Sequence, residues 1–153
     1  MSTSHNLNVT EETLQSPGDA IRTAIILAAG TGVRLKERGK LTPKGCMCLG
    51  EKAIVEESVL RLLAVGIDRI VIVTGHLAEQ YAPLQDRYHQ TVQLVHNSHF
   101  ADSGSMYSLY CARDCVDEAF LLLESDLVYE RRALITCLEH PSDNVLLLAG
   151  FSK

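Results

Sequence analysis

The chain has 153 residues, of which 46% are hydrophobic and 22% are charged, close to the averages of soluble globular proteins. This length suits one compact domain with a sizeable core, and the composition argues against a disordered chain. A formal net charge of −5 without a basic stripe argues against a nucleic-acid partner. No apolar run is long enough to cross a bilayer, and the polar start lacks the apolar segment of a signal peptide, so we expect a cytoplasmic protein without a membrane partner.

The cysteines are odd in number and show no regular framework, which is typical of reduced intracellular thiols. A zinc site could be assembled from four of them, but zinc knuckles favour two residues between ligands, whereas the gaps here are one and three. We therefore expect small hydrophobic side chains rather than zinc ligands or disulfides at Cys46, Cys48, Cys111, Cys115 and Cys137.

The first part of the chain, residues 1–22, is polar and is interrupted by Pro17 and Gly18, which predicts an extension ahead of a domain over residues 23–153. Residues 23–29 (TAIILAA) then form a continuous apolar run. Such a run is typical of a central parallel strand that is buried on both faces.

Strands and helices are expected to alternate along the rest of the chain. A long loop rich in Gly, Lys and Pro precedes a helix over residues 54–65, which Gly66 caps. The β-α-β series implies an α/β fold with a parallel sheet and right-handed crossovers. We expect further strands over residues 69–74, 92–95, 120–123 and 145–149, and further helices over residues 78–88, 106–114 and 131–139.

The turn after the first strand is the most informative motif. Gly30 and Gly32 remove side chains directly after a buried strand, so that backbone amides can approach phosphate groups closely. The dinucleotide-binding fingerprint needs a third glycine where Leu35 stands, and the P-loop needs a Gly-Lys-Ser/Thr ending, which this turn lacks. An NAD enzyme and a P-loop ATPase are therefore disfavoured.

Two cations accompany this turn. Arg34 stands two residues after the second glycine, and Lys44 lies in the Thr42-Pro43-Lys44-Gly45 segment, where the proline stiffens the loop. Fixed cations beside a glycine turn can pair with a triphosphate.

The segment LAAGTGVRL followed by TPKG resembles the signature of sugar-phosphate and small-alcohol-phosphate nucleotidyltransferases. IVIVTGH (residues 70–76), HNSHFADSGSMYSLY (96–110) and FLLLESDLVYE (120–130) are most similar to the 2-aminoethylphosphonate cytidylyltransferases and the related phosphocholine cytidylyltransferases. The resemblance implies a Rossmann-like nucleotidyltransferase fold, in which helices flank a mostly parallel mixed sheet.

The resemblance also implies roles for individual residues. Arg34 and Lys44 would neutralise the triphosphate and the charge that develops at its α-phosphorus. The other expected contacts are main-chain groups of the glycine turn, a turn near the base, and a loop that reads cytosine or holds the acceptor. These nucleotide-binding residues are Leu27, Ala28, Ala29, Gly30, Thr31 and Gly32, then Thr74 and Gly75, and then Ser103 and Ser105.

Asp126 is the strongest candidate for a metal ligand. It follows the expected buried strand 120–123, so its carboxylate should emerge at the same sheet edge as the glycine turn and hold Mg²⁺. Related enzymes often have Asp-x-Asp, whereas this chain has Glu124-Ser125-Asp126, and Glu124 is expected to contact either the metal or the substrate.

The expected reaction is the transfer of a cytidylyl group from CTP to 2-aminoethylphosphonate with release of pyrophosphate. Phosphocholine or a sugar 1-phosphate as acceptor remains an alternative, as does a nucleotide-binding module without turnover, and a homo-oligomer is left open. In the family, a further metal-binding acid and part of the acceptor pocket follow the fifth strand. We therefore expect the 153-residue chain to lack a C-terminal part and to bind CTP weakly without completing the transfer.

Overall fold

The structure, a computed structural model, describes residues 20–148 and is built on four parallel strands in the order β5-β4-β1-β6. Thr23 pairs with Arg69 on one side of β1 and with Phe120 on the other, so the strands begin and end at common edges. The expected α/β fold with a mostly parallel sheet is thus confirmed. The strands are β1 (Thr23–Ala28), β4 (Arg69–Thr74), β5 (Val92–His96) and β6 (Phe120–Glu124).

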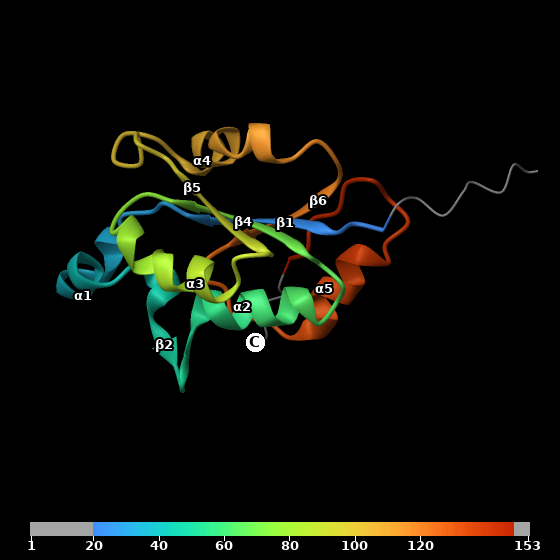
Figure 1. The fold of residues 1–153 in the computed structure, drawn as a ribbon, viewed down its shortest axis with the longest axis horizontal. Coiled ribbons are helices and arrows are strands. Elements are labelled where there is room, and N and C mark those ends of the chain that lie inside the picture. Colours follow the sequence, from blue (N-terminus) through green and yellow to red (C-terminus); the bar gives the residue numbers. More distant parts are fainter. Residues whose placement is uncertain (1–19, 149–153) are drawn as a thin grey trace, which may run out of the picture.

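Helices cover both faces of this sheet (Figure 1). Alternate residues of β1, such as Ala24 and Ile26, face the core beneath α2 (Ile54–Leu63), α3 (Ala82–Arg87) and α5 (Arg131–Leu138). The intervening residues, such as Ile25 and Leu27, pack on the side of α4 (Ser105–Cys111). Each fully buried aliphatic side chain contributes about 1.5–3 kcal/mol, and this two-sided burial explains the continuous apolar run of β1.

Helix α2 is amphipathic and stops where a glycine permits a left-handed turn. Val55, Val59 and Leu62 are fully buried beneath the sheet. Gly66 has φ 90°, and the amides of Gly66 and Ile67 donate hydrogen bonds to the carbonyls of Leu63 and Leu62, both at 3.1 Å. This Schellman pattern confirms the predicted glycine cap.

Short elements occupy the segments that were expected to be loop or longer helix. The expected helix 78–88 is divided into η3 (Ala78–Tyr81) and α3, because Pro83 in the first turn of α3 cannot donate a backbone hydrogen bond. The expected helix 106–114 ends with α4 and continues as η4 (Arg113–Cys115). The long loop contains η1 (Val33–Leu35), α1 (Glu37–Leu41), η2 (Lys44–Cys46), and a hairpin of β2 (Cys48–Leu49) and β3 (Lys52–Ala53).

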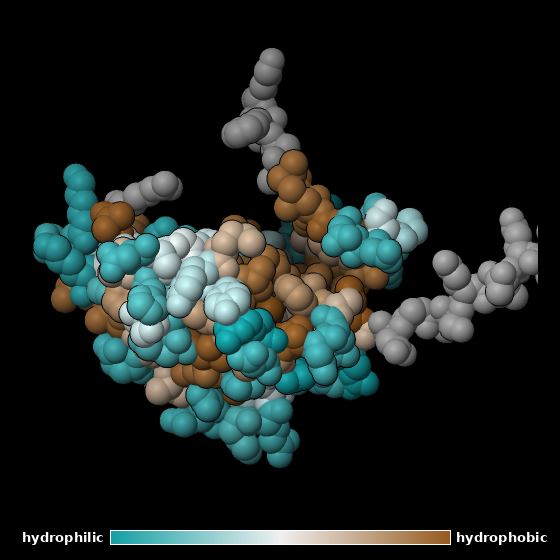
Figure 2. Space-filling model, turned by 90° about the horizontal axis from the view of Figure 1, so that it is seen from above, coloured by the Kyte–Doolittle hydropathy of each residue, from teal (hydrophilic) through white to brown (hydrophobic). Residues whose placement is uncertain are grey.

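The strand predicted over residues 145–149 is wrong for residues 145–148, which are exposed and take no regular secondary structure, and Ala149 lies outside the described residues. An apolar run forms a strand only where a neighbour offers a ladder of hydrogen bonds, and these residues pair with no strand of the described chain. β6 is consequently an edge strand within residues 20–148, and Phe120 and Leu122 are exposed rather than buried as expected. Figure 2 shows apolar surface exposed among hydrophilic residues on the α4 side of the molecule.

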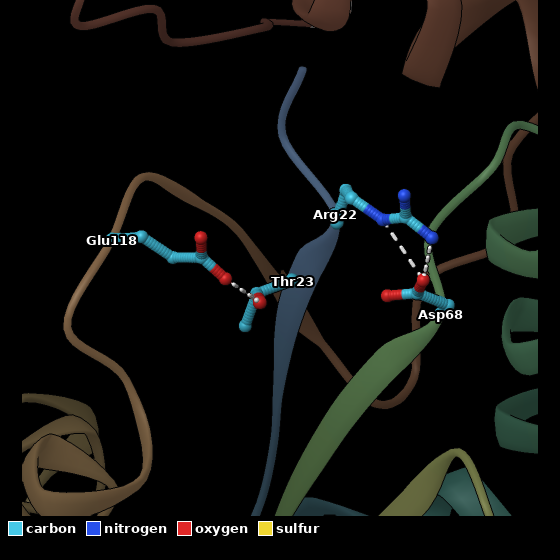
Figure 3. A network of polar contacts seen from close by, with 4 residues as sticks. All are labelled: Arg22, Thr23, Asp68 and Glu118. Carbon is cyan, nitrogen blue, oxygen red and sulfur yellow. Dashed lines mark hydrogen bonds and ion pairs between the residues drawn. The ribbon is translucent and has the colours of Figure 1, made fainter. Parts of the chain in front are cut away.

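Polar contacts hold the amino ends of the strands together (Figure 3). The guanidinium of Arg22 donates to the carboxylate of Asp68, and the Arg22 carbonyl accepts from the amides of Asp68 and Arg69 at 3.0 and 3.2 Å. On the other side of β1, the Thr23 hydroxyl donates to Glu118 Oε1 at 2.9 Å. These contacts fix β1 against both neighbours at the edge opposite to the glycine turn.

The expected extension, residues 1–22, lies outside the described residues except for its last three, and the extent of the domain remains a prediction. None of the helices within residues 20–148 is long and apolar enough to span a membrane.

Candidate functional site

A small cavity of about 70 Å³ opens at the carboxyl ends of β1 and β6. Open α/β sheets commonly bind ligands at this edge, because loops leave the strands there and expose their main-chain groups. The cavity combines the glycine turn after β1, the loop that carries Lys44, a tyrosine from η3, and the turn after β6. Its lining residues are Leu27, Ala28, Gly30, Lys44, Tyr81, Glu124, Ser125 and Asp126.

Gly30 leaves the cavity open. A Cβ atom built at Gly30 would have no heavy atom of the described chain within 4 Å, apart from its two chain neighbours, and its φ lies outside the left-handed region. The protein itself therefore does not require glycine at this position. Glycine here leaves space beside the backbone for a bound group.

Lys44 and Asp126 form an ion pair at the cavity. Lys44 is the first residue of η2, and its Nζ lies 3.2 Å from Asp126 Oδ2. The two side chains are 35% and 37% exposed, and an exposed pair contributes only about 0–1 kcal/mol. A bound anion or cation can therefore replace either partner at little cost.

Gly45 fits the Lys44 loop closely against two other segments. A Cβ atom at Gly45 would lie 2.9 Å from Ser125 Cβ and 3.0 Å from the hydroxyl oxygen of Tyr81, both too close for a side chain. Ser125 is in turn fixed to β1, because its amide donates to the Leu27 carbonyl at 3.0 Å. Glycine at this position thus sets the distance between Lys44 and the turn that carries Asp126.

The carboxylates of Glu124, the last residue of β6, and of Asp126 are groups that could hold a magnesium ion together with a phosphate. Mg²⁺ usually binds one or two carboxylates and completes its shell with phosphate oxygens and water. Glu124 and Asp126 both line the cavity, and Glu124 Oε1 accepts a hydrogen bond from the Ser105 hydroxyl at 3.3 Å. The described residues contain no group of three or more His, Cys, Asp or Glu that could hold a metal by themselves.

The model of the MobA-like NTP transferase domain family matches residues 24–148. The chain belongs to this family. Over 106 residues it is 36% identical to a 2-aminoethylphosphonate cytidylyltransferase of Lancefieldella rimae, covering 69% of this chain and 43% of that protein. It is also 36% identical over 99 residues to a choline-phosphate cytidylyltransferase of Streptococcus pneumoniae, covering 65% of this chain and 42% of that protein.

A solved structure of the Streptococcus pneumoniae CTP:phosphocholine cytidylyltransferase has the same fold, with a TM-score of 0.63 and 36% identity. The match covers 69% of this chain and 46% of that one. These matches confirm the resemblance to the nucleotidyltransferases named above. The chain spans less than half the length of each of these relatives.

In this member of the family, most of the predicted glycine-turn and acidic residues meet at the cavity. Leu27, Ala28, Gly30, Lys44 and Asp126 line it together with Glu124, as the position of the turn after a central strand led us to expect. Ala29, Thr31 and Gly32 continue the same turn without lining it. Arg34 lies in η1, and its side chain is outside the described part of the structure.

The remaining predicted residues lie around the cavity rather than in its wall. Thr74 is buried, and its hydroxyl donates to the Val95 carbonyl at 3.3 Å. Gly75 packs against Phe100 and the end of the glycine turn. Ser103 accepts a hydrogen bond from Asn97 at 3.0 Å, whereas Ser105 reaches the cavity through Glu124.

Sequence reasoning missed two residues of the cavity wall and one that shapes a nearby loop. Tyr81 occupied an apolar position of an expected helix, and Ser125 was only the residue between two acids, so neither gave a signal of its own. Asn97 is fully buried and holds Ser103, Ser108 and the amide of His99 by hydrogen bonds of 2.9–3.1 Å. The position of Asn97 directly after a strand could have indicated its role, because Asn side chains often form hydrogen bonds with the backbone of a following loop.

Proposed function

We propose that this protein is a magnesium-dependent cytidylyltransferase that transfers a cytidylyl group from CTP to 2-aminoethylphosphonate and releases pyrophosphate. The observation that carries the proposal is one cavity that combines an open glycine turn, a lysine and a carboxylate at the carboxyl ends of β1 and β6. The relative with 36% identity, which bears this activity in its name, supports the choice of nucleotide and acceptor.

In the proposed reaction, an oxygen of the phosphonate attacks the α-phosphorus of CTP, and the bond from that phosphorus to the pyrophosphate oxygen breaks. The acceptor is already an anion near neutral pH, so positioning and charge neutralisation matter more than a general base. The turn at Gly30 would lie against the phosphates, and Lys44 would donate to their oxygens. Asp126, with Glu124 beside it, would hold a magnesium ion, which supplies further neutralisation of the phosphate charge.

Phosphocholine is the second candidate acceptor, because the chain is equally similar to a choline-phosphate cytidylyltransferase. Quaternary ammonium groups are commonly bound by aromatic cages. The rings of Tyr107 and Tyr110 on α4 lie 5.8 Å apart, but the guanidinium of Arg113 already covers Tyr110 at 4.0 Å. The face of Tyr110 that Arg113 covers is therefore not free to bind a quaternary ammonium group. The primary ammonium group of 2-aminoethylphosphonate can instead donate hydrogen bonds and needs no aromatic cage, which favours it as acceptor.

The test is pyrophosphate release by the complete protein with magnesium, using CTP, ATP or GTP and each of three acceptors: 2-aminoethylphosphonate, phosphocholine and glucose 1-phosphate. We expect CTP with 2-aminoethylphosphonate to give the highest kcat/KM. Preference for phosphocholine would change only the acceptor, and preference for ATP or GTP would refute the cytidylyltransferase assignment. CTP binding without pyrophosphate release with any acceptor would favour a nucleotide-binding module.

A further inference from the structure

The hydroxyl of Tyr81 is a polar group with no partner at the cavity. The side chain of Tyr81 is fully buried, and its hydroxyl oxygen forms no hydrogen bond within the described part of the protein. The same residue lines the cavity with Lys44 and Asp126. A buried hydroxyl without a partner costs free energy and is rarely kept unless something else satisfies it.

The groups around this hydroxyl do not supply a partner. Cys46 and Ser125 are its polar neighbours and lie close enough to affect its pKa. The distances and angles to them still do not meet the geometry of a hydrogen bond. The Cys46 thiol instead faces the Gln80 carbonyl, with 3.8 Å between sulfur and oxygen. The hydroxyl also touches Gly45, whose missing side chain leaves it room. Burial raises the pKa of Tyr81, so the hydroxyl keeps its proton and remains available as a donor.

We propose that Tyr81 is a ligand-positioning residue whose hydroxyl donates a hydrogen bond to a phosphate oxygen of the bound nucleotide. The inference rests on the proposed function, since it takes the cavity to hold the phosphate chain. A phosphate oxygen is an acceptor, and Lys44 and the open glycine turn make this cavity suitable for an anion. The Tyr81 hydroxyl would thus gain its missing partner only when the ligand is bound.

Such a group should affect stability and binding in opposite directions. Tyr81→Phe keeps the buried ring and removes only the hydroxyl. The ligand-free protein loses an unsatisfied polar group, so its melting temperature should stay the same or rise. CTP binding loses a hydrogen bond to a charged group, so its Kd should increase about tenfold or more. A hydroxyl that only supports the fold would lower the melting temperature and leave the Kd unchanged.

Tyr129→Phe is the matched control. The Tyr129 hydroxyl is also buried without a partner among the described residues, but Tyr129 lies near Ser58 and Arg61 and does not line the cavity. Removing it should change the melting temperature in the same direction as Tyr81→Phe and leave the Kd for CTP unchanged.

The experiment compares the complete wild-type protein with both variants by calorimetric titration of CTP and of cytidine, together with thermal unfolding. We expect Tyr81→Phe to weaken CTP alone. The inference would be overturned if Tyr81→Phe leaves the Kd for CTP unchanged, weakens the binding of cytidine and CTP equally, or lowers the melting temperature. In each of these cases, CTP binding by the wild type would still support the proposed function. If the wild type and Tyr129→Phe bind no CTP, the proposed function itself fails and the inference fails with it.

Discussion

Replacement of Gly30 by alanine should separate ligand binding from folding. The new methyl group meets no atom of the described protein within 4 Å beyond its chain neighbours, and the backbone is outside the left-handed region. Gly→Ala at a compatible position stabilises a protein by about 0.4–1 kcal/mol, because it reduces the freedom of the unfolded chain. We therefore expect the free energy of unfolding to stay constant or to rise.

Binding should respond in the opposite sense. Gly30 lines a cavity of about 70 Å³, and a methyl group there takes up space that the phosphates would fill. Overpacking of a close-fitting site costs about 1–3 kcal/mol. Because each 1.4 kcal/mol is about a factor of ten, the Kd for CTP should increase about fivefold to a hundredfold.

The assay is calorimetric titration of CTP with magnesium beside urea unfolding, and Gly66→Ala is the control. Gly66 lies after the end of α2 with φ 90°, where a side chain costs about 1–2 kcal/mol, and it does not line the cavity. Gly66→Ala should lower stability and keep the Kd for CTP. If Gly30→Ala binds CTP as well as the wild type does, the glycine turn is not the phosphate-binding element.

Three further substitutions or reactions test the rest of the site. Asp126→Ala should lower turnover by about a hundredfold or more with the fold intact by circular dichroism, and near-normal turnover at saturating magnesium would remove Asp126 from the site. Gly45→Ala should destabilise the protein by about 1–3 kcal/mol in urea unfolding and weaken CTP binding, because its Cβ would lie 2.9 Å from Ser125 Cβ; unchanged stability would contradict this close packing. Burial raises the pKa of the Cys46 thiol to about 11, so iodoacetamide should modify Cys46 only as the pH approaches 11, whereas Cys48 is exposed to the reagent. The contribution of the neutral Cys46 thiol to the free energy of unfolding should be fully present below the ordinary pKa of a thiol and be lost as the pH rises through 11. Equal alkylation of Cys46 and Cys48 near pH 8.5, measured by mass spectrometry, would argue against the raised pKa of Cys46.

The central strands could be predicted from the sequence because their burial does not depend on which loops surround them. Residues 24–28 and 70–73 are apolar on both faces, and helices cover both faces of the sheet in the structure. Residues 120–123 form the predicted strand but are partly exposed, and residues 145–148 form no strand. Both runs have no pairing strand on at least one side within residues 20–148. The apolar pattern of a segment indicates that it can form a strand. Whether that strand is buried depends on whether another strand pairs with it.

Those cavity residues that lie at the ends of strands could be predicted from the sequence. Gly30 and Asp126 each stand two residues after the end of a strand, β1 and β6, and the carboxyl ends of adjacent parallel strands lie at the same edge of the sheet. Tyr81 was not predictable in this way, because it belongs to η3 and its hydroxyl packs against Gly45, which is far from it in sequence. The motif thus located the cavity, whereas the contacts that shape its wall needed the folded chain.

The Lys44–Asp126 ion pair predicts that the nucleotide and the metal bind cooperatively, so that each raises the affinity of the protein for the other. In the ligand-free protein the two charges neutralise each other at 3.2 Å. Magnesium alone would take Asp126 and leave Lys44 without its counter-ion, and CTP alone would place its phosphates against the Asp126 carboxylate. When both bind, Lys44 would contact the phosphates and Asp126 would contact the metal, so one weak ion pair would be replaced by two stronger contacts. Typical coupling between two ligands is about 1–3 kcal/mol, so removal of magnesium with EDTA should raise the Kd for CTP about fivefold to a hundredfold.

The variant Lys44→Ala tests the same ion pair from the side of the metal. Because Asp126 is no longer paired with a lysine in this variant, Mn²⁺ titrated alone should bind to it more tightly than to the wild type. Equal Mn²⁺ affinity in the two proteins would show that the ion pair does not restrain the metal site.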